Sequence, residues 1–179
     1  LRRAIVDQLE TVASGAAPRR ILASHSDFQS ALEHHAAPRR SSSVFLAARF
    51  SNSGAVPLLA GPTALFVGTD YVGTTAITQT ATEDELVLPF GVDTGITIDR
   101  TLAGRDTTHA AGRVRSTVRF AFRVNNHRDR AVDVIVLDQL PVSHTAGLSV
   151  AIVPGSRAAE PRAEGDPQGV VRWRIHADA

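Results

Sequence analysis

The chain has 179 residues, 43% of them hydrophobic, and its 19 basic side chains are nearly balanced by 18 acidic ones. This length and apolar content suffice for one domain with its own core and argue against general disorder. A net charge of +1 gives little reason to expect nucleic-acid binding. The absence of cysteine excludes disulfides, thiolate metal sites and a cysteine nucleophile.

Residues 1–18 form a lead-in whose structure the sequence leaves open. Ile5, Leu9 and their neighbours are spaced as on one face of a helix, whereas Ala4–Val6 also fits a short first strand. The chain lacks methionine, which predicts that it is a piece of a longer protein. No apolar run approaches the roughly 18 residues of a membrane-spanning helix, so we expect no transmembrane segment.

Residues 19–179 are predicted to form a β-domain. Its first part is the least regular: residues 19–23 fit a strand, and residues 25–37 are expected to be extended or irregular, with one helical turn near Leu32. Further strands are predicted at residues 44–52, 64–67, 71–77, 86–90, 96–102, 113–126, 131–140, 148–153 and 169–177. Polar links are expected at residues 68–70, 91–95 and 103–112.

Two of these segments indicate how the layers are arranged. Residues 113–126 alternate apolar side chains with arginine, which is typical of an outer strand with one buried face. Residues 131–140 are apolar on both faces, which predicts a central strand. Many short strands without a strong helix predict an all-β fold, an antiparallel β-sandwich of roughly nine to ten strands.

Several short motifs occur in a characteristic order. They are Ala-Pro-Arg-Arg (37–40) before residues 44–52, then residues 57–62, 66–73, 90–93, Arg100, 124–126, 138–143 and Trp173. In this combination the chain resembles the C-terminal domain of mucoidy-inhibitor-A-like proteins, a family of unknown function. The resemblance implies a preceding β-domain and coiled coil, and one more strand after the Trp173 segment that this sequence lacks. The sequence leaves the compartment open between the bacterial envelope and the cytoplasm, and the favoured hypothesis places the domain in an envelope-associated protein.

The resemblance brings no catalytic residues with it, and the motif positions are expected to be structural. They are Gly61, Pro62, Gly68, Tyr71, Gly73, Gly91, Asp93, Arg100, Asn125, Asp138, Pro141 and Trp173. For Asp93 we expect hydrogen bonds to backbone N–H groups in a turn, and for Arg100 an ion pair with a carboxylate.

Catalysis is the least favoured interpretation. A hydrolase would have to use Asp93, Asp99 or His144. Asp138, Ser143 and His144 lie near each other in sequence but make no triad, because neighbours on a strand point apart, and no Gly-x-Ser-x-Gly motif is present. The seven histidines are scattered without the spacing of a helical zinc site and are predicted to lie on the surface. We therefore expect neither a metal nor another cofactor.

Arginine is the one feature with a binding interpretation. Arg115, Arg119 and Arg123 share one side of a predicted strand, and Arg172 and Arg174 share one side of another. If the two strands are neighbours, these side chains form a ribbon able to bind carboxylates, sulfates or phosphates. The alternative is an ordinary outer face whose arginines meet solvent or acidic residues.

The favoured function is a non-catalytic module that mediates protein–protein contacts or assembly, with another protein or another part of the same polypeptide as its partner. An unpaired sheet edge would invite a partner strand. Binding of acidic polysaccharide through the arginine face is the alternative. Few aromatic residues interleave with the arginines, which argues against nucleic acid as a partner.

Overall fold

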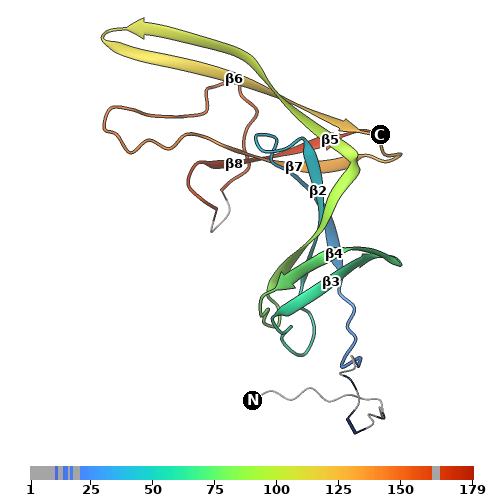
Figure 1. Ribbon diagram of the computed structural model, residues 1–179. Helices are drawn as coiled ribbons and strands as arrows, with labels where there is room; N and C mark the ends of the chain where they lie inside the picture. Colours follow the sequence, from blue (N-terminus) through green and yellow to red (C-terminus); the bar gives the residue numbers. More distant parts are fainter. Residues whose placement is uncertain (1–10, 12–13, 16, 18–20, 163–165) are drawn as a thin grey trace.

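The computed structural model describes residues 11, 14, 15, 17, 21–162 and 166–179, and within them all regular structure is β (Figure 1). The prediction of an all-β fold is confirmed. The predicted lead-in, residues 1–18, lies almost entirely outside the described residues. The described part of the chain has no helix with the length and hydrophobicity of a membrane span.

Six strands form one sheet and two form a separate hairpin. The strands are β1 (Ser30–Ala36), β2 (Ser43–Ser51), β3 (Gly61–Val67), β4 (Asp70–Ile77), β5 (Glu85–Ala110), β6 (Arg113–Asn126), β7 (Val132–Gln139) and β8 (Val170–Ala177). The sheet has the order β6-β5-β2-β1-β7-β8, while β3 pairs only with β4. All pairs are antiparallel except β1 with β7, which is parallel.

β5 is one strand of 26 residues and not two strands with loops around them. Its first half pairs with β2 and its second half with β6. The predicted turn at residues 91–95 is wrong, because Gly91 takes a φ of 90° and the chain passes through as a bulge. The predicted loop at residues 103–112 is also wrong: its polar residues belong to an exposed ladder that ends in the Ala111–Gly112 turn, with φ of 49° and 72°.

This outer half of the ladder projects beyond the sheet as a two-stranded arm (Figure 1). Most of its side chains are exposed on both faces, including Leu102 and Val114. A strand without a buried face need not alternate apolar and polar residues, and residues 103–110 of β5 do not. This is why residues 103–110 were predicted as part of a loop although they form a strand in the structure.

The sheet curls until its two edge strands meet. The rings of Phe122 in β6 and Trp173 in β8 lie 5.6 Å apart, and Asn126 of β6 donates a hydrogen bond to the carbonyl oxygen of Ala177. The core lies inside this curl; its buried members are Ala36, Val44, Ile96, Ile98, Val132, Val134 and Val136. The curl thus buries one face of the sheet without a second sheet.

The predicted sandwich of nine to ten strands is therefore not found among the described residues, which hold eight strands in one curled sheet and a hairpin. β1 replaces the irregular segment and helical turn expected near Leu32. Residues 21–23 and 148–153, predicted as strands, form none. β7 does lie inside the sheet with apolar residues buried on both faces, so its predicted central place is confirmed.

Asn52 fixes the place where the chain leaves β2 for the hairpin. Its side chain is fully buried, and its amide nitrogen donates to the carbonyl oxygens of Val56 and Ala81, both at 3.1 Å. Its side-chain oxygen accepts the N–H of Gly54 at 3.2 Å. The Asn52 side chain thereby links the segment that leads into β3 with the segment that follows β4.

We expect Asn52→Ala to lower the free energy of unfolding by about 2 kcal/mol, because buried carbonyl groups lose their donor. Amide hydrogen exchange should become faster in β3 and β4 than in β7. Asn125→Ala is the control, since Asn125 bonds only the partly exposed side chains of Thr97 and Asp99. Unchanged protection of the hairpin in Asn52→Ala would contradict this role.

Candidate functional site

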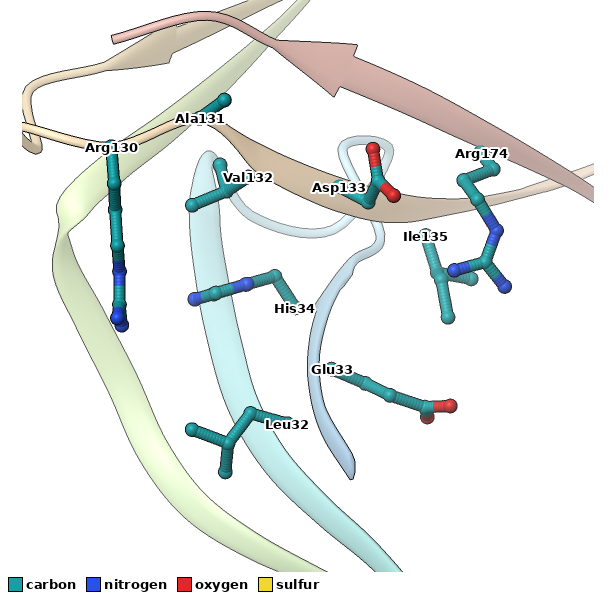
Figure 2. Close-up of a pocket in the computed structure, with 9 residues that line it drawn as sticks. All are labelled: Leu32, Glu33, His34, Arg130, Ala131, Val132, Asp133, Ile135 and Arg174. Carbon is teal, nitrogen blue, oxygen red and sulfur yellow. The ribbon is translucent and has the colours of Figure 1, made fainter. Parts of the chain in front are cut away.

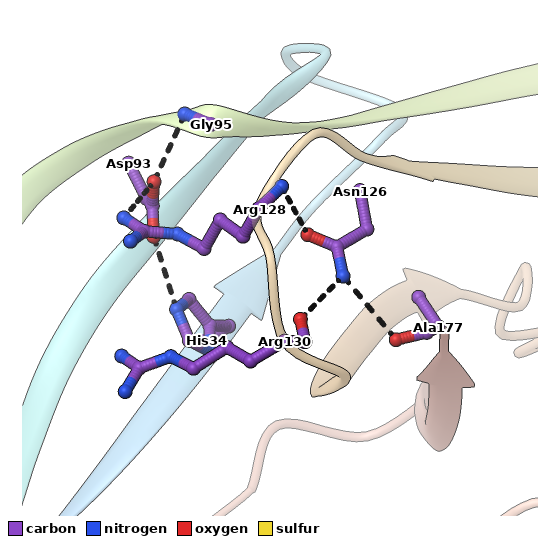
Figure 3. A network of polar contacts seen from close by, with 7 residues as sticks. All are labelled: His34, Asp93, Gly95, Asn126, Arg128, Arg130 and Ala177. Atoms are coloured by element: carbon purple, nitrogen blue, oxygen red, sulfur yellow. Dashed lines mark hydrogen bonds and ion pairs between the residues drawn. The ribbon is translucent and has the colours of Figure 1, made fainter. Parts of the chain in front are cut away.

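A buried carboxylate, Asp93, links three separate parts of the chain (Figure 3). Its oxygens accept hydrogen bonds from Nε2 of His34 in β1 at 3.0 Å and from the guanidinium of Arg128 at 2.6 and 3.0 Å. The backbone N–H of Gly95 donates a further bond at 3.0 Å. The Asp93 side chain is only 1% exposed, so it is held as a fully bonded anion.

The protonation of Asp93 follows from these contacts. Burial raises the pKa of its carboxyl group, but the hydrogen bonds from Arg128 and Gly95 and the charge of Arg128 outweigh burial, and the pKa lies below its ordinary value. Asp93 therefore cannot serve as a general acid near neutral pH. The expected backbone bond in a turn is present at Gly95, although the turn itself is a bulge.

His34 and Arg128 are the members of this network that the sequence did not single out. His34 was grouped with surface histidines, but it is 8% exposed. Asp93 lies 59 residues away and supplies the partner that lets an imidazole be buried. The alternation of β1 is the only local signal, because Ala36 shares a face with His34 and is also buried.

A cavity of about 350 Å³ lies beside this network and is lined by Leu32, Glu33, His34, Arg130, Ala131, Val132, Asp133, Ile135 and Arg174 (Figure 2). Most of its charged groups are paired. Arg49 binds Glu33 at 2.9 Å, and this hydrogen bond lowers the pKa of Glu33 despite partial burial. His176 binds Asp133 at 2.7 Å, and the lining contains no serine, threonine or cysteine that could act as a nucleophile.

A second depression, which we call the β6 groove, has a volume of about 1000 Å³. One wall is formed by residues 116–120 and Phe122 of β6, and the other by residues 150–157 of the long connection between β7 and β8. Trp173 of β8 also lines it, and its indole N–H donates to the carbonyl oxygen of Arg157 at 3.1 Å.

The β6 groove is lined by apolar side chains that remain partly open to solvent. Val118, Phe120, Val150 and Ile152 are each 40–43% exposed. Arg100 lies over the ring of Phe120 at 3.5 Å from its centroid and pairs with Asp138 at 3.0 Å. The expected ion pair of Arg100 is therefore present: Arg100 and Asp138 both line the groove, and their pair connects β5 with the end of β7.

The predicted arginine face lies on the two edge strands of the sheet, which the curl brings together at Phe122 and Trp173. β6 and β8 are its first and last strands and are not hydrogen-bonded neighbours. Arg119 pairs with Asp106 at 2.6 Å, Arg172 with Asp166 at 3.2 Å and Arg174 with Glu160 at 3.2 Å. Arg115 and Arg123 stay exposed on β6, so three of the five predicted guanidinium groups pair with acidic side chains and these two face solvent.

The residues considered for hydrolysis are not assembled either. Asp93 is saturated by its partners, Asp99 accepts a hydrogen bond from Asn125 at 3.2 Å, and His144 lies in the exposed connection after β7. Within the described ranges, no three histidine or acidic side chains come close enough to hold a metal ion.

The remaining motif positions shape strand ends and turns. Gly61 and Pro62 begin β3, Gly68 takes a φ of 61° in the turn to β4, and the Tyr71 hydroxyl lies 2.6 Å from that of Thr74. Gly73 lies in β4 beside the bulge opposite Leu65 and Phe66. Pro141 follows β7 at the β6 groove.

Comparison of the chain with known proteins gives its family and no closer relative. Neither the curated proteins nor the solved structures contain a match. Residues 6–179 match the family described as a domain of unknown function, DUF4139. Because this match spans nearly the whole sequence, the chain belongs to the DUF4139 family.

Proposed function

We propose that this domain is a non-catalytic module that binds another protein, or another part of its own polypeptide, through the β6 groove. The observation that carries the proposal is the groove itself, in which exposed valine, isoleucine and phenylalanine side chains face each other from two walls. Exposed apolar surface that gathers in one depression is typical of protein-binding sites.

The chemistry of the other polar groups supports this choice. Of the groups with acid–base character that the sequence offered, Asp93 is engaged in its network, Asp99 accepts a hydrogen bond from Asn125, and His144 lies apart from both in an exposed connection. The pairing of Arg119, Arg172 and Arg174 with acidic residues leaves less free positive charge for a polysaccharide. The proposal also places the domain in an envelope-associated protein, as the resemblance to mucoidy-inhibitor-A-like proteins suggests. A signal peptide in the full reading frame would support this location.

A photo-crosslinking amino acid placed at Ile152 or Val118 in the native cells is expected to give one discrete covalent adduct with a partner. Val87 is the matched control, because it is 40% exposed like Ile152 but does not line the groove. Equal labelling at all three positions, or an adduct only at Val87, would refute the groove as the binding site.

A further inference from the structure

The groove side of β6 presents a strand edge with no neighbour among the described strands. In an antiparallel pair, alternate residues direct both backbone groups toward the same neighbour. His127, just beyond β6, donates its N–H to the carbonyl oxygen of Gly95 in β5 at 2.9 Å. Odd-numbered residues of β6 therefore face β5, and even-numbered residues such as Val118 and Phe120 direct their N–H and C=O groups outward.

The β6 groove runs along this edge. Consecutive residues 116–120 all line it, although their side chains alternate between the two faces of the strand. A cavity that contacts both kinds of residue touches the edge of the strand and not one face alone. The edge from Val114 to Phe120 is about 20 Å long, enough for a segment of seven residues.

The wall opposite β6 contains a segment whose sequence is typical of a strand, although it pairs with no strand among the described residues. Residues 150–153 read Val-Ala-Ile-Val, yet they form no ladder with any strand in the described part of the chain. A strand with an open edge and a segment rich in β-branched side chains thus flank the groove. An inserted strand would give β6 a hydrogen-bonding partner and cover the exposed valines.

The positive charge of the residues that line the groove favours an inserted strand with acidic side chains. Four guanidinium groups line the groove, those of Arg39, Arg100, Arg119 and Arg157, against the single carboxylate of Asp138. Arg39 makes no ion pair with another described residue, and Arg157 bonds the backbone oxygen of Arg174 at 2.7 Å. These two arginines leave positive charge that the groove itself does not neutralise.

We propose that the β6 groove receives an extended, acidic segment of a partner protein, which adds to the free edge of β6 as a further strand. The proposal rests on the protein-binding function proposed above and specifies its mode. Backbone hydrogen bonds to β6 supply affinity, apolar side chains of the segment meet Val118 and Val150, and its carboxylates meet Arg39 and Arg157.

The probe for the test is a synthetic peptide of about nine residues in which glutamate alternates with valine, with both ends blocked. Trp173 is the only tryptophan in the chain and lines the groove, so its fluorescence reports binding directly. We expect saturable binding that becomes about tenfold weaker when lysine replaces glutamate or when alternate peptide nitrogens are methylated, since several charge contacts or hydrogen bonds are then lost.

Val118→Pro is the matched protein variant. Because the N–H of Val118 points away from β5, proline removes an edge donor while the β5 ladder is kept. Val118→Ala, which keeps the N–H, is the control. The peptide is expected to bind Val118→Pro about tenfold more weakly than Val118→Ala.

Equal binding of all peptides, equal binding of both variants, or no binding of the acidic peptide would overturn strand addition. The proposed function is judged separately: adducts at Ile152 and Val118 in cells, together with a failed peptide test, would keep the groove as a protein-binding site and discard this mode.

Discussion

Asp93→Ala is expected to lower the free energy of unfolding by about 3 kcal/mol. The change leaves His34 and Arg128 without their shared acceptor, and removing one partner of a buried ion pair typically costs about 3–5 kcal/mol. The lower end applies because the Arg128 side chain is 36% exposed and regains water. Urea unfolding followed by Trp173 fluorescence measures the loss.

Asp106→Ala is the control for burial. The Asp106–Arg119 and Asp93–Arg128 pairs have the same nitrogen–oxygen distance, 2.6 Å, but Asp106 is 59% exposed and Asp93 1%. An exposed pair contributes about 0–1 kcal/mol, so Asp106→Ala should change stability little. An equal decrease in the free energy of unfolding in the two variants would show that burial of the Asp93 network does not add to stability.

The same carboxylate predicts a pH dependence. The pKa of Asp93 is lower in the folded protein than its ordinary value of 3.8, so its stabilising effect is complete above that value and is lost as pH falls through the folded pKa. Asp93→Asn should flatten the loss of stability below about pH 4. Some acid dependence should remain, because the pKa of Glu33 is also lowered.

Ile98→Ala is expected to lower the free energy of unfolding by about 3–4 kcal/mol. Ile98 is 1% exposed in the core cluster inside the curl, and removing its outer carbons leaves a cavity that the surrounding core residues fill only in part. Val114→Ala on the same pair of strands is the control, since Val114 is 65% exposed and should change stability by less than about 0.5 kcal/mol. A similar decrease in the free energy of unfolding in both variants would show that Ile98 does not belong to the stabilising core.

The sequence predicts strands well where apolar and polar residues alternate. β6 and β8 lie close to their predicted ranges because apolar residues alternate with arginine along them, although the first half of β6, expected to have a buried face, is exposed on both faces. β5 was divided because glycine and aspartate at its bulge resemble a turn, and because its outer half has no buried face. The predicted strand at residues 148–153 has strand composition but no partner among the described residues, and composition alone does not pair a backbone.

The site was less predictable than the fold. The Asp93 network joins residues 34, 93 and 128, and no local pattern connects positions so far apart. The β6 groove likewise depends on the curl that brings the β7–β8 connection beside β6. Arg100 and Asp138 were both selected as motif positions, but their pairing across 38 residues was visible only in the structure.

The parallel pairing of β1 with β7 has a consequence for how the domain is made. His34 is opposite Val134, 100 residues later in the chain. β1 can therefore pair with β7 only after the roughly 100 residues between them have been synthesised. Contacts of such long range slow folding, because a large loop has to close first. During synthesis, the hairpin and the β1–β2–β5 ladder can form early, while completion of this sheet requires β7 and β8, which are synthesised after the other described strands.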